Sequence, residues 1–296
     1  LLPNCFSDSG NSLYNSVDAP LWFCILAKDL FEIGQLNRQE DSEAVRAVEL
    51  ILERYLNGTD NNIFCDKDGF IYCGTEKSNL TWMDAVIDGV PVTPRHGYPV
   101  EIQALWSECL LFASQLGLSE KYLEIQGSLA AKFSDRFWDD NLGYLADCLS
   151  KDGTRDMSLR PKQIVALGGL SKFPLVSPDR ATRALNTITE KLHCGLGIRT
   201  LSPDDLQYEG VYSGSQLTRD RAYHQGTAWP WLLAYYYVAL NNAGLSFSVD
   251  REFVEIIEQG EAPEIIAGDY PHSPCGAPFQ AWTSSVLPYL RFKGVL

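Results

Sequence analysis

Positively charged side chains are scarce in this sequence of 296 residues. It has 24 Lys and Arg against 38 Asp and Glu, which gives a formal net charge of −14 and a pI of about 4.7. An acidic surface repels phosphate groups, which argues against nucleic acid and against anionic membrane surfaces as partners. A neutral polar partner, such as a sugar, is compatible with this charge.

Long apolar segments are also lacking. No run approaches the roughly 20 residues that a membrane-spanning helix needs, and no basic segment followed by an apolar one marks a secretory signal. The eight cysteines are scattered and include no CxxC pair, so neither a structural zinc site nor a small disulfide scaffold is expected. We therefore expect reduced thiols in a cytoplasmic protein. A disulfide between Cys65 and Cys73, which flank a predicted hairpin turn, is the alternative.

Motifs for metals, phosphates and serine nucleophiles are missing as well. No two of the four histidines lie three or four residues apart, so no metal site is predicted. The sequence has neither a glycine-rich phosphate loop nor a G-x-S-x-G nucleophile motif. We expect no metal and no organic cofactor.

The sequence does have pronounced helical periodicity. Apolar residues recur every three or four positions in about nine segments, each long enough to form a helix. Pro99 stands in the first turn of one predicted helix, where proline is favoured, and Gly58 follows the end of another. The predicted helices span residues 18–33, 42–56, 99–116, 120–137, 160–170, 178–192, 225–242, 250–258 and 278–291.

Strand-like segments are short. Residues 63–65 and 70–73 are expected to form a hairpin around Asp68-Gly69, and residues 143–147 a second short element. No alternation of strands and helices appears, which argues against a doubly wound fold or a TIM barrel. Long loops (59–98, 138–158, 193–223 and 261–276) alternate with tight connections such as 171–177. This pattern favours one all-α domain over residues 1–296, a toroid of helical hairpins with its chemistry at one end.

The long loops place acidic residues beside aromatic ones, as in the pairs Trp82/Asp84 and Tyr208/Glu209. A sugar offers apolar C–H faces and a ring of hydroxyl groups, so Trp and Tyr rings surrounded by polar side chains suit it. Glycoside hydrolysis also needs two carboxyl groups, one protonated as the acid and one ionised as nucleophile or base. The loops therefore indicate sugar hydrolysis, although the same composition occurs in other proteins.

A series of short motifs carries a more specific signal. They are LPNCF (2–6), YNSVDAPLW (14–22), TWMDA (81–85), TPRHGYPVEIQALW (93–106), GYL (143–145), SLRPKQ (158–163), GIRTLSP (197–203), YHQGTAWPW (223–231), APEIIAGD (262–269) and QAW (280–282). Read in this order, the sequence resembles the amylo-α-1,6-glucosidase family, the glucosidase domain of glycogen debranching enzymes, over nearly its whole length. The resemblance implies an (α/α)6 barrel. It also implies hydrolysis of the single α-1,6-linked glucose left at a branch stub of glycogen or limit dextrin.

The resemblance further implies a catalytic pair. Asp84 would be the general acid, and Glu264 would be the general base that activates water. Relatives of the family invert, so the two carboxyl groups are expected to lie roughly 6.5–9.5 Å apart to admit that water. A general acid must keep its proton until it is used, and partial burial of Asp84 near Trp82 is the expected cause.

Further residues are predicted to bind the sugar: Trp82, Arg95, Glu101, Asp220, His224, Gln225, Trp229, Trp231, Tyr270 and His272. Simpler interpretations stay open for several of them. Glu101 would be stabilised as a first-turn acid by the helix dipole, and one of Trp229 and Trp231 is expected to pack in the core. Asp84 and Glu264 could be surface acids, and Asp220 is the rival candidate for the general base.

The family domain usually begins with helices that precede the LPNCF motif and include an acid-bearing G-R-D motif. We therefore expect this sequence to lack the first helices of the barrel and the usual N-terminal partner domain. Other enzyme interpretations are a related glycosidase for another α-glucoside, of trehalase or glucoamylase type, and a barrel phosphorylase. The non-enzyme interpretation is a carbohydrate-binding barrel without turnover.

Overall fold

The computed structural model describes residues 1–296 except residues 4, 7–9, 11, 40 and 172–173. The chain folds into two units. The first comprises Leu1–Asp84, Gly89–Phe137 and Cys148–Arg155, and the second comprises Ala85–Asp88, Trp138–Asp147 and Asp156–Leu296. The single catalytic domain expected over residues 1–296 stays a prediction. Asn4 of the LPNCF motif and residues 172–173 of the predicted tight connection lie outside the described residues.

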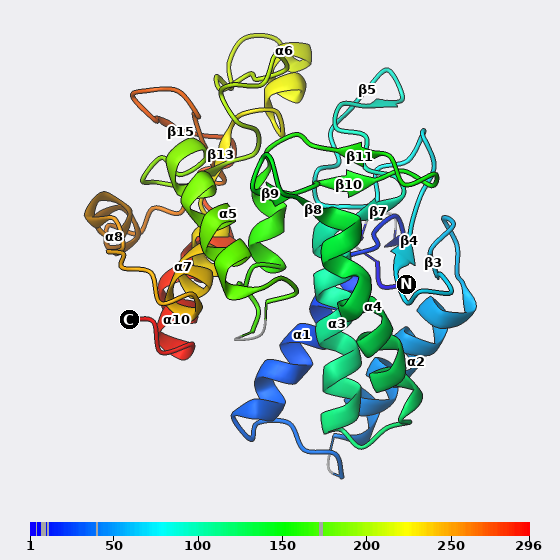
Figure 1. Ribbon diagram of the computed structural model, residues 1–296. Coiled ribbons are helices and arrows are strands. Elements are labelled where there is room, and N and C mark those ends of the chain that lie inside the picture. Colours follow the sequence, from blue (N-terminus) through cyan, green and yellow to red (C-terminus); the bar gives the residue numbers. More distant parts are fainter. Residues whose placement is uncertain (4, 7–9, 11, 40, 172–173) are drawn as a thin grey trace. The chain divides into compact units, whose positions relative to one another are not determined.

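Helices α1 (Ala19–Glu32), α2 (Ser42–Asn57), α3 (Val100–Gln115) and α4 (Lys121–Phe137) form the framework of the first unit. Helix α3 packs against the other three, and Figure 1 shows it beside α4. It is buried along nearly its whole length, and the buried residues include the polar Glu101, Gln103 and Glu108. The indole N–H of Trp106 in α3 donates to the Gly69 carbonyl at 3.1 Å, which fixes the neighbouring hairpin to this helix.

The hairpin predicted around Asp68-Gly69 is confirmed. Strand β3 (Phe64–Cys65) pairs antiparallel with β4 (Ile71–Tyr72). Cys65 lies opposite Ile71, and neither Cys65 nor Cys73 is part of a disulfide, so the alternative of a disulfide between them is wrong. The other strands with residues in this unit are β1 (Cys5–Phe6), β2 (Ser12–Leu13), β6 (Val90–Pro91), β7 (Tyr98–Pro99), β10 (Cys148–Leu149) and β11 (Arg155–Asp156). Of these strands, β11 begins in the first unit and ends in the second.

The second unit is built around α7 (Leu232–Asn242). This apolar helix packs against α5 (Pro178–Lys191), α10 (Val286–Phe292) and a 3-10 helix (Pro161–Val165). Its other helices are α6 (Gln216–Ala222), α8 (Arg251–Glu258) and α9 (Ala281–Ser284), and its short strands include β5 (Val86–Ile87), β8 (Trp138–Asp139) and β9 (Tyr144–Leu145). Strand β9 lies where the second strand-like segment was predicted.

A four-stranded antiparallel sheet in the second unit was not predicted. Its strands are β12 (Ile198–Arg199), β13 (Ala228–Trp229), β14 (Ile265–Ile266) and β15 (Pro274–Cys275), in that order. Ile198 faces Trp229, and Ala228 faces Ile266. The sheet therefore places the motifs GIRTLSP, YHQGTAWPW and APEIIAGD side by side, although up to 72 positions separate them in sequence.

The expectation of an all-α chain needs correction, because these small sheets accompany the helices. The helix predicted over 160–170 is a short 3-10 helix followed by turns at Gly168-Gly169. The helix predicted over 225–242 begins only at Leu232, because residues 228–229 form β13 and Pro230 follows. Helix α6 was missed, and the helix predicted over 278–291 is divided into α9 and α10. No helix in the described ranges is long and apolar enough to cross a bilayer.

Candidate active site

The segment that carries Trp82 and Asp84 is fixed to the beginning of α1. The backbone N–H of Trp82 donates to Oδ2 of Asp18 at 3.1 Å, and Asp18 is buried. The hydroxyl of Ser16 donates to the other oxygen of the same carboxylate. Because Asp18 belongs to YNSVDAPLW and Trp82 to TWMDA, this contact joins two of the motifs within the first unit.

Asp84 ends the first segment of the first unit, and Ala85 begins the segment Ala85–Asp88 that belongs to the second. The Asp84 side chain is exposed, whereas Trp82 is half-buried. The expected partial burial of Asp84 is therefore not observed. Its role as the general acid and its separation from Glu264 stay predictions.

Arg95 and Glu101 form a buried ion pair with each other. Nη2 of Arg95 lies 2.6 Å from Oε2 of Glu101, and Nη1 contacts the second carboxylate oxygen. Only 4% of Arg95 and 3% of Glu101 is exposed. Such forked pairing is strong and directional. Nη1 also donates to Oγ1 of Thr81 at 3.4 Å, so the pair links the first turn of α3 to the residue before Trp82. Contact of either residue with a sugar stays a prediction.

In the second unit, Glu264 precedes β14 and is half-buried. Three donors face its carboxylate: the Tyr223 hydroxyl lies 2.8 Å from Oε1, the Ala277 N–H 3.0 Å from Oε2, and the Gln280 amide 3.4 Å from Oε1. An ionised carboxylate is an acceptor only, so this set of donors matches it. Gly276 adopts φ +73°, and a Cβ added there would lie 2.6 Å from Oε2. A glycine is therefore required for the close approach to Glu264.

An aromatic cluster adjoins this carboxylate. The ring of Tyr223 lies 4.6 Å from that of His224 and 5.0 Å from that of Trp229, and His224 stacks on Trp229 at 5.0 Å. The Trp229 indole N–H donates to the Tyr223 carbonyl at 3.1 Å. Trp229 and His224 are buried, whereas Trp282, 6.2 Å from Trp229, is 47% exposed. The structure thus brings three predicted site residues together: His224, Trp229 and Glu264.

Arg160 fixes the segment that carries His224 and Gln225. Its guanidinium is buried and donates to the His224 carbonyl at 3.0 Å, to the Thr200 carbonyl at 3.1 Å and to Oε1 of Gln225 at 2.6 Å. The guanidinium of Arg199 donates to the Gly268 carbonyl at 2.8 Å. Both arginines therefore bind backbone carbonyls: Arg160 binds the YHQGTAWPW motif, and Arg199 binds the APEIIAGD motif.

The other predicted residues of the second unit are Trp231, Tyr270, His272 and Asp220. Trp231 packs against Tyr235 with their rings 5.7 Å apart, whereas Trp229 contacts Tyr223, which donates to Glu264. Tyr270 is 90% exposed, and the ring of His272 contacts the Ala267 carbonyl through Nδ1 at 3.1 Å. Asp220 is half-buried on α6. Their sugar contacts stay predictions.

Three residues beside Glu264 were not predicted as site residues: the donors Tyr223 and Gln280, and Gly276, which leaves space for the carboxylate. Tyr223 and Gln280 belong to the motifs YHQGTAWPW and QAW, so the signal was present in the sequence. Periodicity carried no information about them, because all three lie outside the helices and strands. Among the described residues, no group of three or more His, Cys, Asp or Glu side chains is arranged to hold a metal ion.

The assembled motifs agree with a comparison against known families. Residues 1–288 match the family described as amylo-alpha-1,6-glucosidase. The chain belongs to this family of glycoside hydrolases. It is 27% identical over 222 residues to the glycogen debranching enzyme of Saccharomyces cerevisiae, a match that covers 59% of this chain and 14% of the yeast protein. The chain therefore spans a small part of the length of that relative.

Solved glycosidase structures share the fold of this amylo-alpha-1,6-glucosidase family member. A GH63 mannosylglycerate hydrolase from Thermus thermophilus, in complex with glucose, is 11% identical with a TM-score of 0.65 and covers 99% of this chain and 78% of its own. A rhamnosidase from Klebsiella oxytoca with rhamnose bound is 16% identical with a TM-score of 0.57, over 96% and 48% of the two chains. At such identities the likeness concerns the fold alone. Family membership implies a carbohydrate substrate.

Proposed function

We propose that this chain hydrolyses the α-1,6-linked glucose of branch stubs in glycogen or limit dextrin, by inversion and without a metal or organic cofactor. The observation that carries the proposal is the fixed carboxylate of Glu264. Both of its oxygens accept hydrogen bonds, and an aromatic cluster lies beside it. A general base needs this kind of fixed orientation toward the water that it activates.

In the proposed mechanism, Glu264 takes a proton from water while that water attacks the anomeric carbon of the terminal glucose. Asp84 gives its proton to the glycosidic oxygen, which leaves as the C6 hydroxyl of the remaining glucan. One bond forms on the face opposite the breaking bond, so α-linked substrate yields β-glucose. The exposed position of Asp84 gives it access to solvent protons for the next turnover.

The choice of branched α-glucan rests on the family and on the yeast debranching enzyme, not on the fold. The two solved relatives act on or bind other sugars, as their descriptions state, so this fold hosts several sugar specificities. For the architecture, we propose the (α/α)6 barrel that the family resemblance implies. The helix-rich units and the shared fold with GH63 and rhamnosidase structures support it.

A substrate panel tests this proposal. The protein is incubated separately with phosphorylase-limit dextrin, trehalose and a linear maltooligosaccharide, and free glucose is measured. Release mainly from limit dextrin supports the debranching activity. Release mainly from trehalose or from the linear chain identifies a glycosidase of trehalase or glucoamylase type. Binding without glucose release from any substrate identifies a carbohydrate-binding domain.

A further inference from the structure

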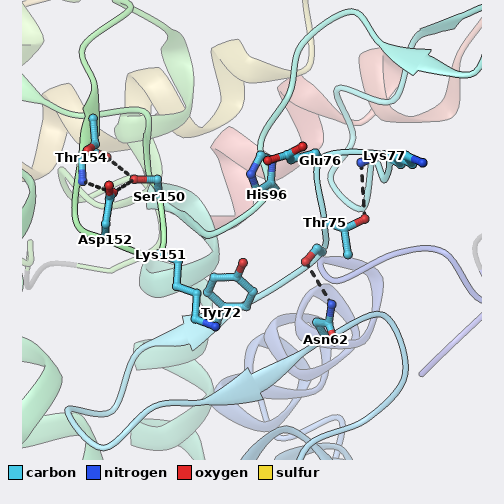
Figure 2. A pocket seen from close by; sticks show the side chains of 11 residues that line it. Asn62, Tyr72, Thr75, Glu76, Lys77, His96, Ser150, Lys151, Asp152 and Thr154 are labelled. Atoms are coloured by element: carbon cyan, nitrogen blue, oxygen red, sulfur yellow. Dashed lines mark hydrogen bonds between the residues drawn. The ribbon is translucent and has the colours of Figure 1, made fainter.

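A cavity of about 940 Å³ opens in the first unit, and none of the residues given a role so far lines it. Ligand pockets typically enclose about 300–1,000 Å³, so this space is large enough for several sugar rings. Four chain segments line it: Asn62 before β3, the end of β4 with the loop after it, the residue following Arg95, and the turn after β10 (Figure 2). The side chains used below are Tyr72, Glu76, Lys77, His96, Lys151 and Asp152.

Polar groups in this cavity are available to a ligand. In the part of the chain that the structure describes, the side chains of Glu76, Lys77, His96 and Lys151 form no hydrogen bond or ion pair with the rest of the protein. The turn that carries Lys151 is itself fixed, because Asp152 accepts a hydrogen bond from the Thr154 N–H at 3.0 Å. The cavity therefore presents free donors and acceptors from a defined backbone.

An aromatic surface lies between these groups. The ring of Tyr72 is stacked on Phe64 at 5.2 Å and meets the edge of Tyr98 at 5.3 Å. These contacts fix the ring, and Figure 2 shows it on the same side of the cavity as Lys151. Sugars bind to such rings through their C–H faces, and a ring that is already fixed loses little entropy on binding.

The charge balance selects the ligand. Lys77 and Lys151 supply two positive charges, and Glu76 and Asp152 supply two negative ones. A phosphate or another anion would meet the carboxylates, whereas a neutral polyol can donate to the carboxylates and accept from the ammonium groups. We propose that this cavity is a carbohydrate subsite for a short segment of neutral α-glucan, separate from the glucose that is cleaved. The choice of α-glucan as the sugar rests on the proposed function.

The cavity is connected to the Asp84 segment within the first unit. His96 follows Arg95, whose guanidinium donates to Thr81, three residues before Asp84. A glucan chain bound in the cavity would contact His96, which is next in sequence to the arginine that supports the TWMDA motif. This placement suits the outer part of a branched substrate and predicts an effect on substrate affinity rather than on the chemical step.

Hydrogen–deuterium exchange tests the inference. It is measured on the Glu264→Gln protein, because loss of the proposed base prevents turnover. Maltoheptaose is expected to slow exchange in peptides that cover residues 72–77 and 150–154. The double variant Lys77→Ala/Lys151→Ala should lose this protection and weaken maltoheptaose binding by about tenfold or more, because losing even one hydrogen bond to a charged group costs about that factor. Lys67→Ala, an exposed lysine on the β3–β4 turn outside the cavity, is the matched control and should change neither reading.

Unchanged exchange in both peptides would overturn the inference, as would protection by inorganic phosphate but not by maltoheptaose. Glucose release from limit dextrin by the wild type is measured in parallel. Release without protection of the two peptides contradicts the cavity and leaves the proposed function standing. Protection that is lost in the double variant, without any release, contradicts the proposed function and supports the cavity as a sugar site.

Discussion

The hydroxyl of Tyr223 donates a hydrogen bond of 2.8 Å to Oε1 of Glu264. Tyr223 directly follows α6, and Glu264 directly precedes β14, so two motifs 41 positions apart meet in this contact. The Ala277 N–H holds the other carboxylate oxygen. Within the proposed mechanism, Tyr223 is thus a positioning residue that acts through the general base.

Replacing Tyr223 by Phe removes one donor to Glu264 and keeps the ring in the aromatic cluster. A hydrogen bond to a charged group contributes about 1.5–3 kcal/mol, so kcat should fall by about tenfold to a hundredfold while KM stays within about twofold. Steady-state glucose release from limit dextrin measures both. Tyr212→Phe is the matched control, because its ring lies 5.7 Å from that of Tyr223. Equal losses in the two variants would contradict the positioning role.

A larger side chain at Gly276 tests whether the space beside Glu264 is needed for catalysis. Ala at this position would place its Cβ 2.6 Å from Oε2 of Glu264, and the positive φ adds strain. We expect a loss of at least about tenfold in kcat, since displacing a catalytic group by an ångström costs that much or more. Gly260→Ala has a similar φ of +81° with nothing within 4 Å, so it should be destabilised comparably and keep its kcat. Equal kcat values for both variants would argue against a catalytic Glu264.

Cys275 reports on the charge of Glu264. Burial raises the pKa of this thiol to about 11, and the negative charge of Glu264 acts in the same direction. Only the thiolate is alkylated, so the rate of iodoacetamide modification at Cys275 should rise with pH until about 11. The Glu264→Gln substitution removes the charge and should lower the pKa and speed the reaction at a pH of about 8.

Mass spectrometry of the alkylated peptides measures this rate. Cys194 is the internal control, because burial raises its pKa to about 11 as well and Glu264 is not among the causes. Its rate should be the same in the wild type and in Glu264→Gln. An unchanged rate at Cys275 in the variant would show that Glu264 carries no charge in the folded protein.

Loss of the Arg95–Glu101 ion pair is predicted to lower the free energy of unfolding. Glu101→Gln leaves a buried guanidinium without its full counter-charge, a change that typically costs about 3–5 kcal/mol of unfolding free energy. Urea unfolding measures the difference. Glu255→Gln breaks an exposed pair with Arg251, whose side chain is 92% exposed, and should cost less than about 1 kcal/mol. Similar costs for both variants would contradict the burial of the Arg95 pair.

Helices with long segments of periodically spaced apolar residues, such as α1 to α5, could be predicted from the sequence. It missed the sheet β12–β15 because strands of two residues have no period of their own. Their pairing depends on contacts between distant segments, such as Ala228 with Ile266. The predicted helix start at residue 225 was wrong because apolar residues in β13 continue the helical pattern of α7.

The candidate site was predicted through its motifs rather than through its geometry. Motif order pointed to Glu264, His224 and Trp229, which lie together in the second unit. It did not reveal that Arg95 and Glu101 bind each other, because sequence spacing of six positions says nothing about the fork that the two side chains form. The Ala277 donor to Glu264 directly follows the turn at Gly276, and neither residue belongs to a quoted motif.

The most direct test of the central claim is the anomer of glucose that is first released from limit dextrin, followed by proton NMR. The wild type is predicted to release β-glucose before mutarotation sets in. Release should fall by about a hundredfold or more in both Asp84→Asn and Glu264→Gln, since each variant loses one partner of general acid–base catalysis. Initial α-glucose would contradict inversion. Full activity of Glu264→Gln together with an inactive Asp220→Asn would contradict Glu264 as the base and assign that role to Asp220.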